Sequence, residues 1–482
     1  MANNSKAGNS KVGQLIDWVD ERTGVKALTD EALNEPIRGG ARWAYVFGSA
    51  LLFLFVLQVV TGIALSLYYV PTADHAHASV SYIQKALPGG ALLRGIHHYG
   101  SSLMIIVAVL HLAQTFFYGA YKQKRELIWV VGVVMLLIIL GFGFTGYLLT
   151  WDQAAYFGTK VGTSIAGEIP VVGSVQQKIM LGGADLTTVT LSRFFTTHVF
   201  LLPLTLALLA GLHVALFRKT GPAGPYHTND DKKIDRFFPK QVFMDSVAML
   251  VVFVVLVYLA MKMPAELGPV ADPSSDYLAR PPWYFMPLFQ LLKYFPGSLV
   301  IIPTAILPAV IFGALFLLPF LDRSAERNPF KRPIASLTLI LVLAGAGGLI
   351  WLAKHQDSTN PEVAGKLKKQ EEEMHAFFKE PFKPQVIGAT AAGAVPAGAA
   401  GAAPKAYLES CSDCHGTGGQ GESDMGPTLI GVHNKPQRTK EDLLKILDDA
   451  RAYGLQKPMP PSFPDLSEED KKAIVEWMVN LK

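Results

Sequence analysis

The sequence of 482 residues has little charge and almost no cysteine: 17% of the residues are charged, and only two are Cys. Two cysteines exclude a disulfide-rich scaffold, which needs several bridges. The low charge excludes an intrinsically disordered chain, because such chains are rich in charged and polar residues. The net charge of +4 is too small to indicate nucleic acid as a partner.

The sequence is instead rich in long apolar blocks. Half of its residues are apolar, and about 20 consecutive apolar residues allow a helix to cross a membrane. Uncharged blocks of 20 or more residues are found at 43–69, 95–119, 127–150, 194–217, 297–321 and 334–353, and a shorter block lies at 246–261. We therefore expect an all-α fold built on a seven-span transmembrane helical bundle.

The distribution of basic residues predicts the orientation. Residues 1–42 are polar and lack the apolar core of a signal peptide, so we expect an inside N-terminus. The inside segments then carry 19 Lys and Arg and the outside segments 8, as the positive-inside rule requires. Seven spans place the C-terminal tail outside. Near the N-terminus, Leu15, Ile16 and Trp18 suit either an amphipathic helix on the membrane surface or a soluble cap helix.

The tail contains both cysteines in one short motif. Cys411 and Cys414 are followed directly by His415, which is the attachment signature of a c-type haem. The preceding residues 356–404 begin with a charged segment, expected as a solvated helix. They end in a stretch in which 16 of 21 residues are Ala, Gly or Pro, which predicts a linker. Residues 405–482 then have the composition of a small globular domain.

Five histidines lie inside predicted spans, where ionisable residues usually indicate function. His98 directly follows His97 and points about 100° away from it on a helix, so it is the weaker ligand candidate. His97 and His111 are 14 residues apart in the second span, and His198 and His213 are 15 apart in the fourth. In a helix, 14 residues turn about 40° less than four circles, so paired histidines share one face. Both spans run in the same direction, so the heights match in pairs. This arrangement predicts two haems, each held between two histidines; hydrogen-bonded bundle histidines are the alternative.

Glycines repeat the same interval in the first and third spans. They are Gly48 and Gly62, and Gly132 and Gly146. A glycine inside a helix costs about 1 kcal/mol relative to alanine, so a regular set suggests that a flat group approaches the backbone. Close packing of helices is the other explanation. The histidines expected at the surface are His75, His77, His227, His355, His375 and His433.

At these residues the chain resembles cytochrome b of the quinol:cytochrome c oxidoreductase (cytochrome bc) family over residues 12–350. The motifs are Arg94-x-x-His97, Gly146-Tyr147-Leu148-Leu149-Thr150-Trp151 and the run 218–225 that begins with Arg218. The 15-residue interval and the absence of an eighth span are similar to the chloroplast-type branch, whose two chains are joined here. The resemblance implies a four-span haem b bundle at 43–220 and a three-span quinol-site domain at 221–355. It also places Arg94 and Arg218 among the cofactor-binding residues.

The family has two quinone sites, and the resemblance places the outer site at Pro281-Pro282-Trp283-Tyr284. The family motif there is Pro-Glu-Trp-Tyr, so Pro282 replaces the glutamate to which quinol binding and proton release are assigned. Proline neither accepts a proton nor donates a backbone hydrogen bond, so another group or water must take the proton. Trp283, Tyr284 and Tyr147 are the expected quinol-site groups. Residues 171–180 resemble the surface helix that caps this site, or form an ordinary loop helix.

The inner site is expected beside the deeper haem, near Arg218. Lys240 and Asp245 either supply protons there or are ordinary exposed groups at the span boundary. The chloroplast-type branch also carries a third, covalent haem on a cysteine near the start of the first span, where this sequence has Val46. A thioether-linked third haem therefore cannot form, whereas a noncovalent one stays open.

Residues 405–482 resemble a small soluble, all-α class I cytochrome c domain. The resemblance implies that Cys411 and Cys414 attach the haem and that His415 binds its iron. Met459, between two prolines, is the expected sixth ligand, because methionine ligation raises the reduction potential. Met425 is the alternative.

The resemblance as a whole implies a fused cytochrome b and c subunit of a bacterial quinol:cytochrome c oxidoreductase, active within a complex. Its cofactors would be two noncovalent haem b, one covalent haem c and a quinol, either menaquinol or ubiquinol. Its partners would be a Rieske iron-sulfur protein, a downstream cytochrome c or oxidase and a second copy of the chain. It would lie in the bacterial cytoplasmic membrane, with the cytochrome c domain outside. The alternative is a dihaem b anchor that relays electrons for a separate dehydrogenase, which the substitution at Pro282 favours.

Overall fold

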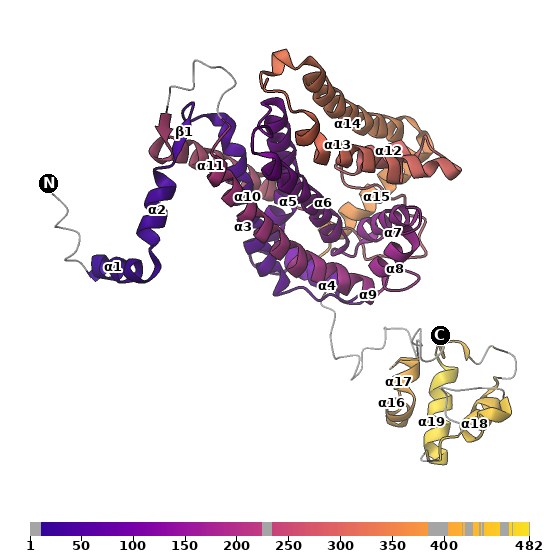
Figure 1. Ribbon diagram of the computed structural model, residues 1–482. Coiled ribbons are helices and arrows are strands. Elements are labelled where there is room, and N and C mark those ends of the chain that lie inside the picture. The colour runs from indigo at the N-terminus through magenta and orange to yellow at the C-terminus, as the bar shows by residue number, and fades with distance from the viewer. Residues whose placement is uncertain are drawn as a thin grey trace. The chain divides into compact units, whose positions relative to one another are not determined.

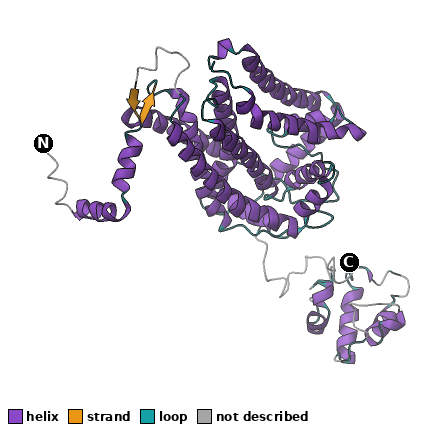
Figure 2. Ribbon diagram, in the orientation of Figure 1, coloured by secondary structure: helices purple, strands orange, loops and turns teal. Residues whose placement is uncertain are grey.

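The computed structural model describes residues 11–223, 234–383, 403–416, 418–419, 428–432, 435, 438–453, 462–464 and 466–481. The chain divides into two compact units, Met1–Phe382 and Lys383–Lys482. In the part of the chain that the structure describes, both units are helical and one small pair of strands lies in the first unit, which confirms the all-α fold (Figure 2).

Among its described residues, the first unit contains seven helical segments that are long and apolar enough to cross a membrane, as expected; Figure 1 shows how these helices pack together. Their helices are α3 (Val46–Ser66), α5 (Gly90–Phe117), α6 (Glu126–Leu148), α9 (Thr188–Thr196) continued by α10 (Leu202–Thr220), α11 (Val242–Lys262), α13 (Leu307–Leu321) and α14 (Pro333–Thr359). The fifth span is longer than the apolar block at 246–261, because it begins at Phe237 and includes Asp245.

The spans are apolar on both their inward and their outward faces. On α3, for example, Leu54 is buried in the core, while Val56, Val60 and Ile63 are exposed. A helix that is apolar all round suits a lipid environment rather than water. The core between α3, α5, α6, α10 and α11 consists of Ala50, Leu54, Met104, Ile105, Val107, Ala108, Ile139, Leu206 and Leu256.

Shorter helices gather at one end of the spans. They are α4 (Ala76–Lys85), α7 (Gln153–Gly167), α8 (Gly173–Leu181), α12 (Met286–Leu292) and α15 (Pro361–Lys379). The charged segment after α14 forms α15, but one face of this helix is packed rather than solvated. Phe377 lies 5.2 Å from the ring of His77, and Lys85 Nζ donates to the Phe377 carbonyl at 2.5 Å. Helix α15 therefore folds back along the first unit.

The opposite end of the spans carries α1 (Lys11–Thr23), α2 (Val25–Leu33) and the antiparallel strands β1 (Pro36–Arg38) and β2 (Ile234–Arg236). Two loops at this end meet at Asp322. Its carboxylate accepts hydrogen bonds from Lys122 at 2.7 Å, Tyr121 at 2.6 Å and Arg332 at 3.0 Å. Burial alone would raise the pKa of Asp322, but the hydrogen bonds from Lys122 and Tyr121 outweigh it and hold the pKa at about 2.

The second unit packs short helices around its own core. They are α16 (Lys405–Ser410), α17 (Ser412–His415), α18 (Lys440–Asp448) and α19 (Glu468–Val479). Thr439 and Ser467 cap the N-termini of α18 and α19 with their hydroxyls. Tyr407 and Trp477 lie at the centre, with ring centroids 4.4 Å apart.

Candidate functional site

The structure brings together the four histidines that the sequence singled out. His97 and His198 form the first histidine pair, with ring centroids 6.2 Å apart and planes at 72°. His111 and His213 form the second histidine pair, and their rings lie close enough to interact electrostatically. An imidazole nitrogen binds a metal at about 2 Å and the ring centroid lies about 1 Å further, so two rings on opposite sides of one iron have centroids about 6 Å apart. The first pair thus fits a bis-histidine haem.

Each glycine of the 14-residue set faces one of these histidines. A Cβ added at Gly146 would lie 2.6 Å from His198 Cε1, and one at Gly62 would lie 3.2 Å from His97 Cε1. The corresponding distances for the second pair are 3.4 Å from Gly132 to His213 and 3.9 Å from Gly48 to His111. The glycines therefore give the imidazole rings room against the facing helices, which is a more direct role than plain helix packing.

A π-helical segment explains the unequal spacing of the histidines. Residues Thr197–Leu201 form η2, directly at His198, and the Leu202 N–H bonds to the Thr197 carbonyl five residues earlier. A π-turn contains about one residue more than an α-turn, so 15 residues here turn the chain as 14 do in α5. Pro203 follows and has no N–H to continue the regular pattern. Both histidines of the span consequently face the same side.

Two threonine hydroxyls contact the rings of the first histidine pair, and the sequence did not lead us to predict them. Thr61 Oγ1 lies 3.0 Å from His97 Nδ1, and Thr145 Oγ1 lies 3.0 Å from His198 Nδ1. Within the described part of the chain, the buried Nδ1 atoms of the second pair have no hydrogen-bond partner. The His213 ring faces the Ile128 backbone without reaching hydrogen-bond geometry.

The two arginines assigned to cofactor binding make protein contacts. Arg94 is buried and donates to Gln84 at 2.7 Å and to the carbonyls of Ala265 and Glu266 at 2.9 and 2.6 Å. Arg218 lies in the last turn of α10 and forms an ion pair with Glu35 at 3.5 Å. Arg94 therefore fastens the loop after α11 to α5, and a cofactor role for either arginine stays a prediction.

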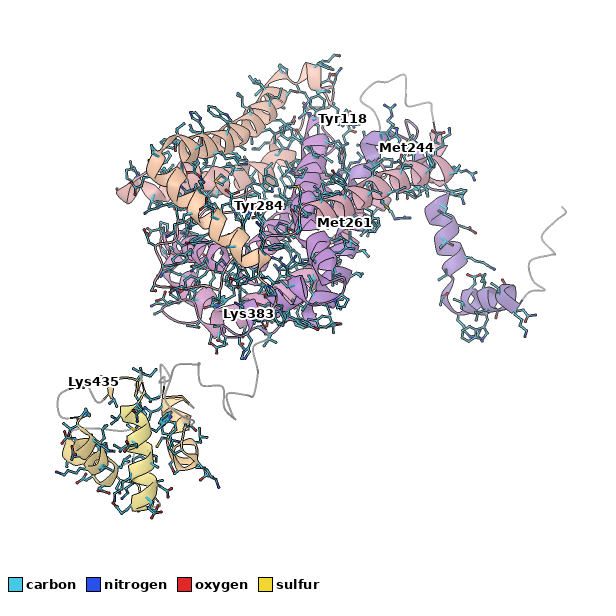
Figure 3. The ribbon with its side chains drawn as sticks, turned by 180° about the vertical axis from the view of Figure 1, so that it is seen from behind. Tyr118, Met244, Met261, Tyr284, Lys383 and Lys435 are labelled. Atoms are coloured by element: carbon cyan, nitrogen blue, oxygen red, sulfur yellow. The ribbon has the colours of Figure 1, made fainter. Side chains whose placement is uncertain are left out.

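The Pro282 loop lies against the spans that carry the histidines and their glycines. Trp283 Nε1 donates to Ser102 of α5 at 3.4 Å. The Tyr284 hydroxyl donates to the Gly143 carbonyl of α6 at 3.3 Å, and Figure 3 shows Tyr284 among the helices of this unit. Tyr147 packs against Gly158 of α7, where an added Cβ would lie 2.7 Å from the Tyr147 ring. The structure also forms α8, close to the helix expected at 171–180. The predicted quinol-site residues thus come from two elements at one end of the bundle, the Pro282 loop and α6.

His77 is not at the surface, contrary to expectation. It is 7% exposed, and its Nε2 lies 2.8 Å from the Gly268 carbonyl. The Gly268 N–H in turn donates to Asp152 at 3.1 Å, and Asp152 caps α7. Burial lowers the pKa of His77, which keeps the ring neutral near pH 7. His77 therefore joins α4 to the loop beside the Pro282 end of the bundle, a contact between residues 191 positions apart.

At the other end, Asp245 and Lys240 have different surroundings. Asp245 is 7% exposed and accepts a hydrogen bond from Gln241 at 2.9 Å. Lys240 is exposed and forms an ion pair with Asp235 at 2.8 Å. The expectation of two exposed groups is thus wrong for Asp245. The fifth span begins at Phe237, so Asp245 lies within it and contacts the buried Gln241.

In the second unit, the residues predicted to attach a haem lie on one turn. Cys414 and His415 are in α17, and Cys411 precedes it and packs on the core. Burial raises the pKa of the Cys411 thiol to about 11, with a smaller contribution from Cys414. Two thiols and an imidazole on one turn suit covalent attachment of a c-type haem. Met459 and Met425 lie outside the described residues.

Comparison with known proteins places the chain in a family. A cytochrome bc complex cytochrome b subunit of Chlorobaculum thiosulfatiphilum is 42% identical over 347 residues, 70% of this chain and 80% of that protein. The chain belongs to the cytochrome b family of cytochrome bc complexes. The family described as Cytochrome b/b6/petB matches residues 34–221, and Cytochrome b(C-terminal)/b6/petD matches 276–368. Residues 398–478 match the family described as Cytochrome C oxidase, cbb3-type, subunit III.

Other relatives agree with this cytochrome b assignment. The menaquinol:cytochrome c reductase cytochrome b subunit of Bacillus subtilis is 41% identical over 222 residues, 44% of this chain and 99% of that protein. A chain of the solved structure titled Hyperthermophilic respiratory Complex III matches with a TM-score of 0.65 at 28% identity, covering 75% of this chain and 96% of that chain. This chain is thus an integral-membrane cytochrome b subunit of bc type with a C-terminal cytochrome c domain, and these domains imply haem.

Proposed function

We propose that this chain is the fused cytochrome b and c subunit of a bacterial quinol:cytochrome c oxidoreductase. It oxidises membrane quinol at the outer face and passes electrons across the membrane through two b haems and outward to a covalent haem c. The observation that carries this proposal is the alignment of two half-buried histidine pairs across one bundle, with 6.2 Å between the ring centroids of the first pair. Haem, when bound, supplies one-electron redox chemistry at each level.

We assign quinol oxidation to the Pro282 end of the bundle, next to the first histidine pair. Trp283 and Tyr284 both donate to the haem-bearing half of the chain, which positions the loop close to the first pair. Burial raises the pKa of Tyr284 to about 12. Tyr284 therefore acts as a hydrogen-bond donor near neutral pH and not as the base that replaces the missing glutamate.

We assign quinone reduction to the opposite end, where Asp245 supplies protons. Its carboxyl group is buried at the start of α11, beside Ser49. Ser49 directly follows Gly48, the glycine that faces His111 of the second histidine pair. An enclosed carboxyl group close to the second pair is better placed for proton delivery than the exposed Lys240. Basic residues enriched at this end agree with an inner, cytoplasmic location.

The cytochrome c domain is proposed to stand outside and to receive electrons through a Rieske-type partner, since the chain has no further cysteines for a cluster. We propose from composition alone that the Ala/Gly/Pro-rich stretch 384–404 serves as a tether, since residues 384–402 lie outside the described residues. A second copy of the chain is proposed to complete a dimer. The name of the Bacillus relative makes menaquinol the first quinol to test, before ubiquinol.

Pyridine haemochrome spectra of the purified chain test the proposal. We expect two b haems and one c haem per chain. His198→Leu should remove one b haem, whereas Cys411→Ala combined with Cys414→Ala should remove only the c haem. A single b haem in the unaltered chain would refute the ladder of two pairs.

A dihaem anchor for a separate dehydrogenase is the second candidate, because Pro282 removes the usual proton acceptor. Such an anchor would bind the same haems without oxidising quinol. Quinol-dependent reduction of the b haems by the complex, inhibited by a quinol analogue at the outer site, distinguishes the two functions. Haem reduction that does not respond to the analogue would favour the anchor.

A further inference from the structure

The two histidine pairs differ in the residue that precedes each facing glycine. For the first pair these residues are Thr61, before Gly62, and Thr145, before Gly146. For the second pair they are Phe47, before Gly48, and Val131, before Gly132. The same difference is present on two separate spans. One hydroxyl per histidine therefore distinguishes the first pair from the second, and it does so on both sides of the bundle.

The hydrogen bonds of the threonines fix the direction of their contact with the histidines. The Thr61 hydroxyl donates to the Leu57 carbonyl at 2.7 Å, and the Thr145 hydroxyl donates to the Gly141 carbonyl at 2.8 Å. A hydroxyl has one proton, so its oxygen accepts from the imidazole. The proton of each ring is thereby assigned to Nδ1, and Nε2 keeps its lone pair.

We propose that Thr61 and Thr145 are positioning residues that fix the tautomer of the first histidine pair and make it the more electron-donating pair. This inference rests on the proposed function, in which each pair holds one b haem. A hydrogen bond accepted from Nδ1–H makes the other ring nitrogen a stronger donor to a metal. A stronger donor stabilises ferric over ferrous iron, so the two hydroxyls lower the midpoint potential at the first pair relative to the second. This difference directs electrons from the first level to the second.

Redox titration of the purified complex, followed at the b-haem absorption bands, tests the proposal without reference to turnover. Thr61→Val and Thr145→Val remove the hydroxyls and keep the β-branched shape. We expect each to raise the midpoint potential of one b haem, with a larger rise in the double variant and no shift of the other haem. The component that belongs to the first pair is identified by its absence from His198→Leu.

Two further variants serve as controls. Thr61→Ser retains the hydroxyl and should restore the original potential. Thr205→Val removes a hydroxyl in the same span as His198 that donates to the Leu201 carbonyl at 2.8 Å, and it should leave both potentials unchanged.

The possible outcomes separate this inference from the proposed function. Unchanged potentials in the double variant, with both b haems present, would overturn the role of the threonines and leave the two-haem ladder intact. Haem loss in Thr61→Val that Thr61→Ser reverses would support the role, because the hydroxyl is then needed to hold the ligand. Fewer than two b haems in the unaltered chain would overturn the proposed function and this inference with it.

Discussion

Arg280 and Asp357 form a bidentate ion pair, with Nε to Oδ2 and Nη2 to Oδ1 distances of 2.8 and 2.7 Å. Arg280 directly precedes the Pro281-to-Tyr284 run, and Asp357 lies near the end of α14. The pair therefore fastens the proposed quinol loop to the last span. The two side chains are only 19% and 14% exposed, so salt screens them less than a surface pair.

We expect Asp357→Asn to raise the KM for quinol more than it lowers kcat, because the loop shifts while Trp283 and Tyr284 remain. The free energy of unfolding should fall by about 1–3 kcal/mol, since a half-buried guanidinium loses charge-assisted hydrogen bonds. Steady-state quinol oxidation and thermal unfolding of the complex measure the two effects. Asp276→Asn is the control, because its ion pair with Lys366 is exposed; equal effects of the two variants would contradict the prediction.

Alanine substitution of the four glycines should impair haem binding in a graded order. The order follows the distance from the added Cβ to the histidine ring: Gly146 (2.6 Å), Gly62 (3.2 Å), Gly132 (3.4 Å) and Gly48 (3.9 Å). Gly146→Ala should lose one b haem, because a contact below 3 Å forces His198 to move. Gly48→Ala should retain both. Haem content per chain measures the series, and Gly313→Ala, with open space around it, is the control.

The pH dependence of quinol oxidation should not involve Tyr284. The pKa of its phenol is raised to about 12 by burial, so the group stays protonated throughout the working range. We expect Tyr284→Phe to slow turnover. Loss of the hydrogen bond to the Gly143 carbonyl should lower the free energy of unfolding by about 0.5–1.5 kcal/mol. The shape of the pH profile should not change between about pH 5 and 9. A shifted apparent pKa in that window would show that Tyr284 exchanges a proton in the reaction.

The stability of the protein should depend on pH through Asp322, which lies at the end of the bundle opposite to the Pro282 loop. Its pKa of about 2 in the folded protein lies below the value of about 3.9 in an unfolded chain. Its contribution to stability is therefore fully present above about pH 4 and is lost as the pH falls toward 2. We expect Asp322→Asn to lower the unfolding temperature at about pH 7 and to differ less from the unaltered chain at about pH 3. Asp185→Asn, an exposed position, should change little at either pH.

Much of the site could be predicted because the number of residues per helical turn decides which side chains share one face of a helix. The 14-residue intervals of Gly48 and Gly62 and of His97 and His111 required only the residues per turn of an α-helix. The same rule matched the heights of histidines on separate spans. It contains no information on which glycine faces which histidine, since that depends on how α3, α5, α6 and α10 pack.

The remaining features depend on contacts between distant residues. Arg94 bonds to the carbonyl of Ala265, 171 positions away, and His77 to that of Gly268. Nothing in the local sequence distinguishes such a buried loop residue from a surface one. The signal for Thr61 and Thr145 was present, however: a threonine precedes each glycine at one level, and an apolar residue precedes each at the other.

The π-turn at Thr197–Leu201 also determines which length changes the bundle tolerates. Removal of one residue within that turn would convert it to an α-turn and keep His198 and His213 on one face. Removal of one residue between His97 and His111 in α5 would instead rotate His111 by about 100° and take it out of the second pair. The fourth span thus accepts a single-residue deletion that the second span does not. The extra residue of the π-turn therefore leaves the directions of His198 and His213 as they would be in an α-helix with a 14-residue interval.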